Sequence, residues 1–342
     1  MRRVAVVALC GMLLAASTAG ATSLDDTARF LAGKGASSDP AYKEYAEEIQ
    51  TGWKQFEQPN LDHMRTWWNG RAPAKYSTVF YPFGGPDIGN ALTLFPDADT
   101  YLLFGLEPIG GVLDLEALDP GSISAGLTEL AASLSTVLQV NYFFTKAMAK
   151  KLGTGSFNST TGLLLFFLAM NDCEVTGAKP IAIGDSIPGI EITFERGKKA
   201  RTVRYFSVNV ADASLAKTSA AFLPYVKRQG RFVTMIKSAS YLMHKEGIAQ
   251  PVHFEKIRAL ILEQSDFIVQ DDSGVPLRLF ARDKWKLQFH GKYDAPTTEF
   301  GKFLQPDLKV EMQRNSTGKL PFSYGYAYKQ GESNLMTAEL RP

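Results

Sequence analysis

Residues 77–108 constrain the fold more than any other stretch of the chain. They contain four parts in order: a β-prone run at 78–83, a glycine-rich turn at 84–86, a short helical pattern at 87–95 and a second buried β-prone run at 100–105. The crossover between the two runs, 84–99, is 16 residues long, which exceeds the roughly dozen residues that a parallel connection needs. The sequence therefore predicts a βαβ unit with two parallel strands.

The patterns on either side of this unit predict an α/β or α+β fold. Asp39 and Pro40 are typical of a helix start, and apolar residues at steps of three and four predict a helix that packs in the core and ends before Pro59, after which Asn60 caps a shorter helix. We expect further helices at 123–138, 143–152, 163–170 and 214–226, helical segments around Tyr241 and Ile257, strands at 180–183, 190–195, 203–210 and 232–236, and C-terminal hairpins. This order favours a mixed β-sheet covered by helices.

No proline- or serine-rich linker, low-complexity tract or fixed-period repeat divides the chain. We therefore expect residues 22–342 to form a single globular domain. A two-lobed arrangement remains open, with a helix-rich lobe at 22–170 that carries the βαβ unit and a lobe of meander and hairpins at 171–342.

The first 21 residues have the three parts of a secretory signal peptide. Arg2 and Arg3 give a positive start, an apolar run follows at 4–16, and Ala19-Gly20-Ala21 matches the small-residue cleavage pattern. The apolar run is shorter than the roughly 20 residues that a membrane-spanning helix needs. We therefore expect cleavage near Ala21, a periplasmic or secreted location, and no transmembrane segment in the mature chain.

Removal of the signal would change the charge and cysteine counts. Lys and Arg total 37 and Asp and Glu total 35, so the loss of Arg2 and Arg3 leaves 35 of each sign. Such neutrality argues against nucleic acid as a partner. Of the two cysteines, Cys10 would leave with the signal, so Cys173 has no partner for a disulfide. Acidic neighbours would raise the pKa of its thiol, which favours a buried or idle cysteine over a nucleophile.

The βαβ unit also predicts a candidate site. Adjacent parallel strands end at one edge of the sheet, where open α/β sheets bind their ligands. Tyr81, Asp87 and Glu107 follow or end the two strands, and His244 follows the strand at 232–236. Two carboxylates in one crevice could divide into a general acid and a general base. The structural alternatives are that Asp87 favours the start of its helix, that Glu107 is solvated, and that His244 is a structural histidine.

The charges are segregated along the chain. Residues 76–145 contain eight acidic residues and no Lys or Arg, whereas residues 196–237 contain ten basic residues and one acid. The candidate anion-binding set is Arg196, Lys198, Lys199, Arg201 and Arg204. These residues predict a patch for an anionic envelope component or a small anionic ligand. The structural alternative is that the basic segment lies over the acidic one.

Two short motifs have structural alternatives. Ile183-Gly184-Asp185-Ser186-Ile187 resembles the nucleophile block of the GDSL hydrolases, which implies that Ser186 would act with a distant Asp and His; the resemblance covers five residues, and the later blocks of that family are not matched. Asp271-Asp272-Ser273-Gly274 lies between two β-prone runs and predicts a hairpin turn in preference to acid–base or metal duty. No nucleotide, calcium or zinc motif is present, so we expect no cofactor and no metal.

These observations favour an exported cell-envelope protein that binds a ligand or a partner. The alternative is a metal-independent hydrolase or lyase of an envelope saccharide or ester, in which Asp87 and Glu107 share acid–base duty with support from Tyr81 or His244. A separation of about 5–9.5 Å between the carboxyl groups across an open cleft is what glycoside chemistry uses.

Overall fold

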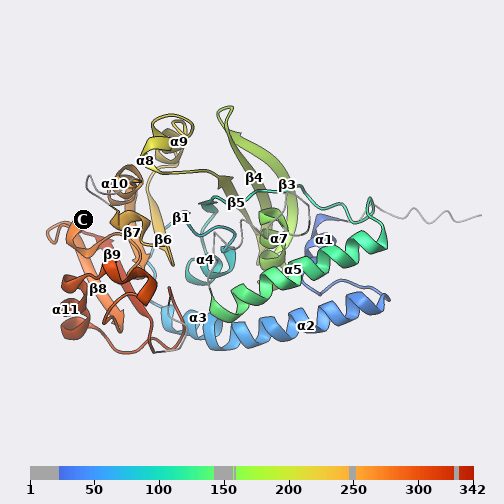
Figure 1. The fold of residues 1–342 in the computed structure, drawn as a ribbon, viewed down its shortest axis with the longest axis horizontal. Coiled ribbons are helices and arrows are strands. Elements are labelled where there is room, and N and C mark those ends of the chain that lie inside the picture. Colours follow the sequence, from blue (N-terminus) through green and yellow to red (C-terminus); the bar gives the residue numbers. More distant parts are fainter. Residues whose placement is uncertain (1–22, 142–156, 158, 246–251, 327–330) are drawn as a thin grey trace, which may run out of the picture.

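The computed structural model describes residues 23–141, 157, 159–245, 252–326 and 331–342. Within these residues, nine strands form one mixed sheet in the order β3-β4-β5-β2-β1-β6-β7-β9-β8 (Figure 1). The two strands from the N-terminal half of the chain, β1 and β2, lie between β5 and β6 from the C-terminal half. The sheet confirms the predicted mixed α/β class.

The predicted βαβ unit is confirmed. β1 (Thr78–Pro82) pairs in parallel with β2 (Thr100–Gly105), in a register that runs from Thr78 opposite Thr100 to Pro82 opposite Phe104, and α4 (Ile88–Leu94) connects them. Both strands are almost wholly buried, as strands covered on both faces must be.

The remaining strands extend the sheet on both sides of this unit. Their bounds are β3 (Glu174–Ile183), β4 (Ile187–Arg196), β5 (Lys199–Ser207), β6 (Phe232–Ile236), β7 (Ser265–Gln270), β8 (Trp285–Gly291) and β9 (Asn334–Leu340). β3, β4 and β5 form the predicted antiparallel meander, and β5 lies parallel to β2. β6 and β7 are parallel to β1, whereas β9 is antiparallel to both β7 and β8.

Helices cover both faces of the sheet, and each face has its own hydrophobic core. One core includes α1 (Leu24–Leu31), α2 (Pro40–Phe56), α3 (His63–Trp68), α4, α5 (Pro120–Val140) and α7 (Thr160–Met170). The other includes α8 (Asp212–Leu215), α9 (Phe222–Lys227), α10 (Glu255–Gln264) and α11 (Pro306–Asn315). The short helices are η1 (Glu57–Asp62), η2 (Leu242–His244), η3 (Leu277–Leu279) and η4 (Thr298–Phe303).

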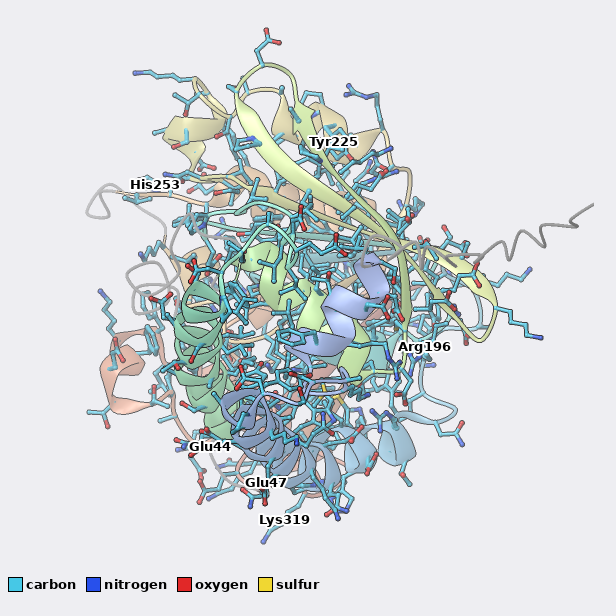
Figure 2. All side chains as sticks on the ribbon, turned by 90° about the vertical axis from the view of Figure 1, so that its right-hand side faces the viewer. Glu44, Glu47, Arg196, Tyr225, His253 and Lys319 are labelled. Atoms are coloured by element: carbon cyan, nitrogen blue, oxygen red, sulfur yellow. The ribbon has the colours of Figure 1, made fainter. Side chains whose placement is uncertain are left out.

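The start of α2 and its packing agree with the sequence pattern. Asp39 accepts a hydrogen bond from the Ala41 amide at 2.9 Å, and Pro40 is the first helical residue. The residues of the apolar stripe are buried, whereas Glu44 and Glu47 are exposed (Figure 2).

The α-helix ends before Pro59, as predicted, because α2 ends at Phe56, but the helical backbone does not break there. A π-helical turn, η1, contains Pro59 and joins α2 directly to α3. The wider π turn accommodates a residue that has no amide hydrogen. Asn60 does not cap a new helix; its side-chain amide donates to the Phe56 carbonyl at 3.0 Å.

Two further predictions need correction, and one lies outside the described residues. The helix predicted at 214–226 is two short helices, α8 and α9, because Pro224 cannot donate the hydrogen bond that a continuous helix requires. The hairpin predicted at 271–274 is absent from this part of the chain. β7 leads into a loop in which the Gln270 side-chain amide donates to the Val275 carbonyl and its oxygen accepts from the Val275 amide, and η3 follows. The predicted helix at 143–152 lies outside the described residues.

Candidate functional site

The carboxyl ends of β1, β6 and β7 meet at one edge of the sheet. β1 lies between β2 and β6, and all three strands are parallel. The chain adds β2 on one side of β1 and β6 on the other, so the strand order reverses at β1. Such a reversal of strand order is where open α/β sheets bind ligands. The residues that follow these three strands bring together Asp87, Lys237 and Asp271.

A buried ion pair forms the centre of this site. The Lys237 ammonium lies 3.0 Å from Oδ2 of Asp87, and their side chains are 1% and 5% exposed. Lys237 also donates to the main-chain carbonyl of Asn141. Because two charges removed from water are costly unless they are well paired, this arrangement depends on each partner.

Neutral side chains complete the surroundings of Asp87. The Tyr81 hydroxyl donates to Oδ2 of Asp87 at 2.8 Å, and the Asn90 amide donates to Oδ1 at 2.8 Å. The same Asn90 amide donates to Oδ1 of Asn141 at 2.9 Å, and the Asn141 amide donates to the Ser323 carbonyl at 2.9 Å. These contacts connect the loop after β1 to the end of α5 and to the C-terminal region.

Two adjacent carboxyl groups, Asp271 and Asp272, follow β7 and are buried. Oδ2 of Asp271 accepts from the Ser238 amide at 3.0 Å, and its Oδ1 accepts from the Ser273 amide at 3.1 Å and from the Ser273 hydroxyl at 2.5 Å. Burial, followed by the charge of Asp272, raises the pKa of Asp271 to about 7. Burial also raises the pKa of Asp272. Asp271 is therefore able to exchange a proton near neutral pH.

Asp272 belongs to the adjoining part of the site. It accepts hydrogen bonds from the Tyr241 hydroxyl and, at 3.0 Å, from the Asn334 amide. The ring of His244 lies with its centroid 5.1 Å from that of Tyr241 and 5.8 Å from that of Phe303. Predicted residue His244 thus lies beside Tyr241, on the Asp272 side of the site.

Backbone strain is concentrated in the loops at this edge. Phe83, Asn141, Ser238, Ser240 and Tyr241 all have positive φ angles between 51° and 63°. Residues other than glycine seldom adopt this conformation, and such strain clusters where function demands a particular geometry.

Ser238 is the most informative of these strained residues. The residue is 9% exposed, and its hydroxyl has no hydrogen-bond partner among the described residues. The carbonyl oxygen of the Asn90 side chain, 3% exposed, is also without a partner in this part of the chain. Buried polar atoms are normally satisfied, so the Ser238 hydroxyl, just after β6, and the Asn90 carbonyl oxygen, in α4, are candidates for contact with a bound molecule.

Asp87 and Glu107 occupy separate networks. The Glu107 side chain is 1% exposed, and its Oε2 accepts from the Tyr205 hydroxyl at 3.1 Å, whereas Asp87 contacts Tyr81, Asn90 and Lys237. Asp87 also accepts from the Asn90 main-chain amide at 3.4 Å as the N-cap of α4. The alternative that Glu107 is a solvated carboxylate is therefore wrong, because this residue is buried.

The candidate anion-binding residues lie on β4, β5 and the turn between them. Lys199 forms an ion pair with Asp99 at 2.8 Å, and Arg204 forms one with Glu191 at 2.7 Å. Arg196 donates to the Leu92 carbonyl, and buried Arg201 donates to the carbonyls of Arg196 and Lys199. Lys198 is exposed in the turn. Figure 2 labels Arg196, the last residue of β4.

The two short motifs have different positions. Ser186 lies in the turn between β3 and β4, where its hydroxyl donates to the Thr218 carbonyl at 3.1 Å. The site at the carboxyl ends of β1, β6 and β7 does not contain it. The 271–274 segment, in contrast, supplies the Asp271 and Asp272 carboxyl groups to that site.

Cys173 is buried, and burial raises the pKa of its thiol to about 11. We predict that the native chain from Thr22 onward will not react with iodoacetamide at pH 8 over the time in which the denatured chain is fully alkylated, because the thiolate is the reactive form. Mass spectrometry of the two samples measures this. Equal labelling rates would contradict the burial of this thiol.

Sequence reasoning missed Lys237, Asn141 and the role of Asp271. In the sequence, Lys237 stands out only as the last residue of the basic stretch at 196–237, and Asn141 belongs to no recognisable motif. A signal was available in the pattern itself: Lys237 directly follows the β-prone run 232–236, and Asp271 follows the apolar run 267–269 after one polar residue, as Asp87 follows the turn after β1.

The described residues contain no cluster of three or more metal-ligating side chains. No helix among them is long and apolar enough to cross a membrane. No protein-family model matches the chain, and no curated protein is similar to it.

Proposed function

We propose that this chain is an exported protein that binds a small polar ligand at the carboxyl ends of β1, β6 and β7. The observation that carries the proposal is the buried Ser238 hydroxyl, which lacks a partner among the described residues and follows β6 in a strained conformation. A ligand that accepts or donates a hydrogen bond there would satisfy it.

The buried charges next to Ser238 support a binding role. The Lys237–Asp87 pair and the Asp271 carboxyl group lie at the reversal of strand order, and replacing such groups with apolar ones often costs a fold little or nothing. Their presence at the usual ligand position of an open α/β sheet therefore favours function over simple stability.

The export part of the proposal rests on residues 1–21. Their positive start, apolar run and Ala19-Gly20-Ala21 cleavage pattern support a periplasmic or secreted protein whose mature chain begins at Thr22. N-terminal sequencing of the protein secreted by a bacterial host tests this part: Thr22 is expected, and an intact Met1 in the cytoplasmic fraction would contradict it.

A metal-independent hydrolase or lyase is the second candidate. It is favoured by the two adjacent buried carboxyl groups of Asp271 and Asp272, where burial raises the pKa of Asp271 to about 7, a range that suits general acid–base catalysis. Asp271 and Asp272 are then the paired carboxyl groups, because Asp87 is neutralised by Lys237 and Glu107 contacts Tyr205.

The contacts of the basic residues favour a small ligand over an anionic envelope polymer. Arg204 and Lys199 already face carboxylates, and Arg201 is buried against main-chain carbonyls. An extended anionic partner would have to compete with these contacts.

Ser238→Ala tests the binding proposal without disturbing the fold. Removal of an unpartnered buried hydroxyl should leave the free energy of unfolding unchanged or slightly higher. A thermal-shift screen of the chain from Thr22 against envelope glycans, lipids and small anions first identifies a ligand, since binding to the native state raises the melting temperature. We expect Ser238→Ala to bind that ligand about tenfold more weakly.

Ser273→Ala is the matched control. The Ser273 hydroxyl donates to Asp271 and accepts from the Ala239 amide at 2.7 Å, so its removal should lower stability by about 1–3 kcal/mol. Unchanged affinity in Ser238→Ala, together with a loss of its stability, would show that this hydroxyl has a structural role and would contradict the proposal.

A further inference from the structure

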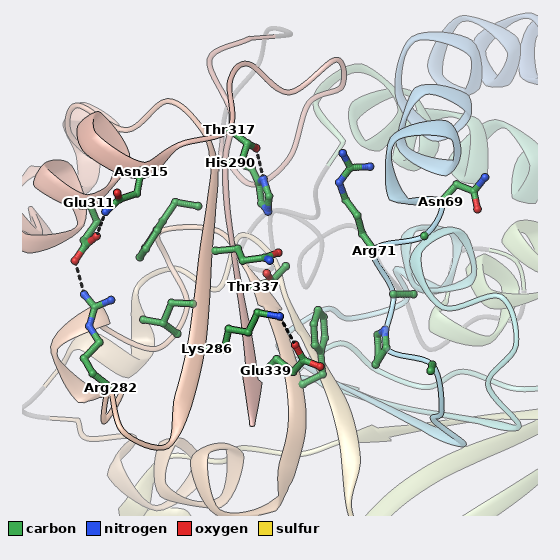
Figure 3. Close-up of a pocket in the computed structure, with 18 residues that line it drawn as sticks. Asn69, Arg71, Arg282, Lys286, His290, Glu311, Asn315, Thr317, Thr337 and Glu339 are labelled. Carbon is green, nitrogen blue, oxygen red and sulfur yellow. Dashed lines mark hydrogen bonds and ion pairs between the residues drawn. The ribbon is translucent and has the colours of Figure 1, made fainter. Parts of the chain in front are cut away.

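A pocket lies around edge strand β8, and its lining contains none of the residues that follow β1, β6 and β7. This pocket has a volume of about 760 Å³, which lies within the range of small-molecule and peptide sites. Figure 3 shows Arg71 and Asn69 on one side, Arg282 and Glu311 on the other, and β8 between them. Polar side chains such as Gln288 and Thr337 line it as well.

β8 is the last strand in the order of the described sheet; its inner edge pairs with β9, and Phe289 also forms an isolated parallel bridge with Ser316. Its outer edge is partly used by the chain itself: the Thr317 amide donates to the Phe289 carbonyl at 3.0 Å, and the Gly291 amide donates to the Gly318 carbonyl at 2.7 Å. Main-chain groups of every second residue point the same way in a strand, so Leu287 also presents its N–H and C=O outward.

Leu287 lines the pocket, and on its outer side no hydrogen bond joins its main-chain N–H or C=O to the described residues. An unpaired edge of this kind accepts an additional extended strand, in which main-chain hydrogen bonds give affinity. The pocket surrounds the edge, so alternate side chains of such a strand would enter its two sides.

The charges of the pocket indicate what else the occupant carries. Arg282 lies 2.6 Å from Glu311, and Lys286 lies 3.3 Å from Glu339, so each of these cations faces a carboxylate. Arg71 stacks over the Trp67 ring at 4.5 Å and has no carboxylate partner in the described part of the chain. Burial, followed by the charge of Arg71, lowers the pKa of His290 to about 4, so this histidine is neutral at pH 7. The walls therefore have one uncompensated positive charge.

We propose that this pocket binds a short extended peptide with a free carboxylate, which pairs its backbone with Leu287 and directs its carboxylate to Arg71. Arginine binds carboxylates through charge-assisted, often bidentate, hydrogen bonds. The site is independent of the one at Ser238.

The test uses the chain from Thr22 and equilibrium dialysis against a pool of random tripeptides with free carboxylates, followed by calorimetry with the most enriched peptide. We expect its C-terminal amide, and its form N-methylated at the paired amide, each to bind about tenfold more weakly. N-methylation removes a main-chain donor without altering the protein.

Arg71→Gln assigns the carboxylate contact. Arg71 is exposed, so the variant should fold normally, and it should bind the free acid about tenfold more weakly while its affinity for the amide stays unchanged. Lys75→Gln, an exposed cation on the same segment that does not line the pocket, is the control and should behave as the unmodified chain. The proposal is overturned if no peptide is enriched, if acid and amide bind equally, or if Arg71→Gln weakens both to the same extent.

Discussion

Replacement of Lys237 by methionine is expected to lower the free energy of unfolding by about 3–5 kcal/mol. The substitution keeps the length of the side chain but leaves the Asp87 carboxylate buried without its cation. It also removes the hydrogen bond to the Asn141 carbonyl, which is the end of α5. Urea denaturation at pH 7, monitored by circular dichroism, measures the change.

A double variant separates the ion pair from the packing of the lysine chain. Lys237→Met combined with Asp87→Asn should recover part of the lost stability, because no unpaired charge then remains buried. Lys199→Met is the control: its pair with Asp99 is about half exposed on both sides, so the loss should not exceed about 1 kcal/mol. If Lys237→Met and Lys199→Met lower the free energy of unfolding by the same amount, the buried Lys237–Asp87 pair does not have the stabilising role that we assign to it.

Asp271→Asn is expected to change how stability depends on pH. The pKa of Asp271 is raised from 3.8 to about 7 in the folded chain, so between these values the native state holds a proton that the unfolded state has lost. Below about pH 4 the Asp271 carboxyl is protonated in both states, so it does not lower the free energy of unfolding. As the pH rises toward 7, this group lowers the free energy of unfolding by about 1.4 kcal/mol per pH unit. The amide side chain does not titrate, so the variant should lack this fall.

The measurement compares urea denaturation of both proteins at several pH values between 4 and 8. The difference in unfolding free energy, variant minus unmodified chain, should increase with pH up to about 7 and then become constant. Asp266→Asn is the control, because Asp266 is an exposed residue of the same strand that pairs with Arg231. Parallel stability curves for Asp271→Asn and the unmodified chain would show that Asp271 is ionised throughout.

Local patterns predicted the elements that depend on neighbouring residues. The β1-α4-β2 unit has its turn, helix and second strand within about thirty residues, and Asp39 with Pro40 marks the start of α2 without tertiary information. The predictions failed where tertiary contacts decide between two structures that suit the local sequence. The polar residues at 271–274 suit a hairpin turn as well as they suit a loop. β7, however, is an interior strand with β6 and β9 on its two sides, and its chain continues into a loop and η3.

The candidate site could be predicted only in part for the same reason. Tyr81 and Asp87 were found because both belong to the βαβ unit, and the structure brings them into contact at 2.8 Å. Lys237 is 150 residues from Asp87 in sequence, and only the pairing of β6 with β1 places them together. Glu107, although it follows β2, contacts Tyr205 of β5 on the other side of the unit.

Hydrogen–deuterium exchange with and without the strongest ligand from the thermal-shift screen tests the central claim most directly. Binding at the carboxyl ends of β1, β6 and β7 predicts slower amide exchange in residues 83–90, 237–241 and 271–275, with little change at 69–74 and 285–291. Protection confined to the latter two segments, which border the β8 pocket, would contradict the proposed site. Unchanged exchange in the first three segments with a bound ligand would do the same.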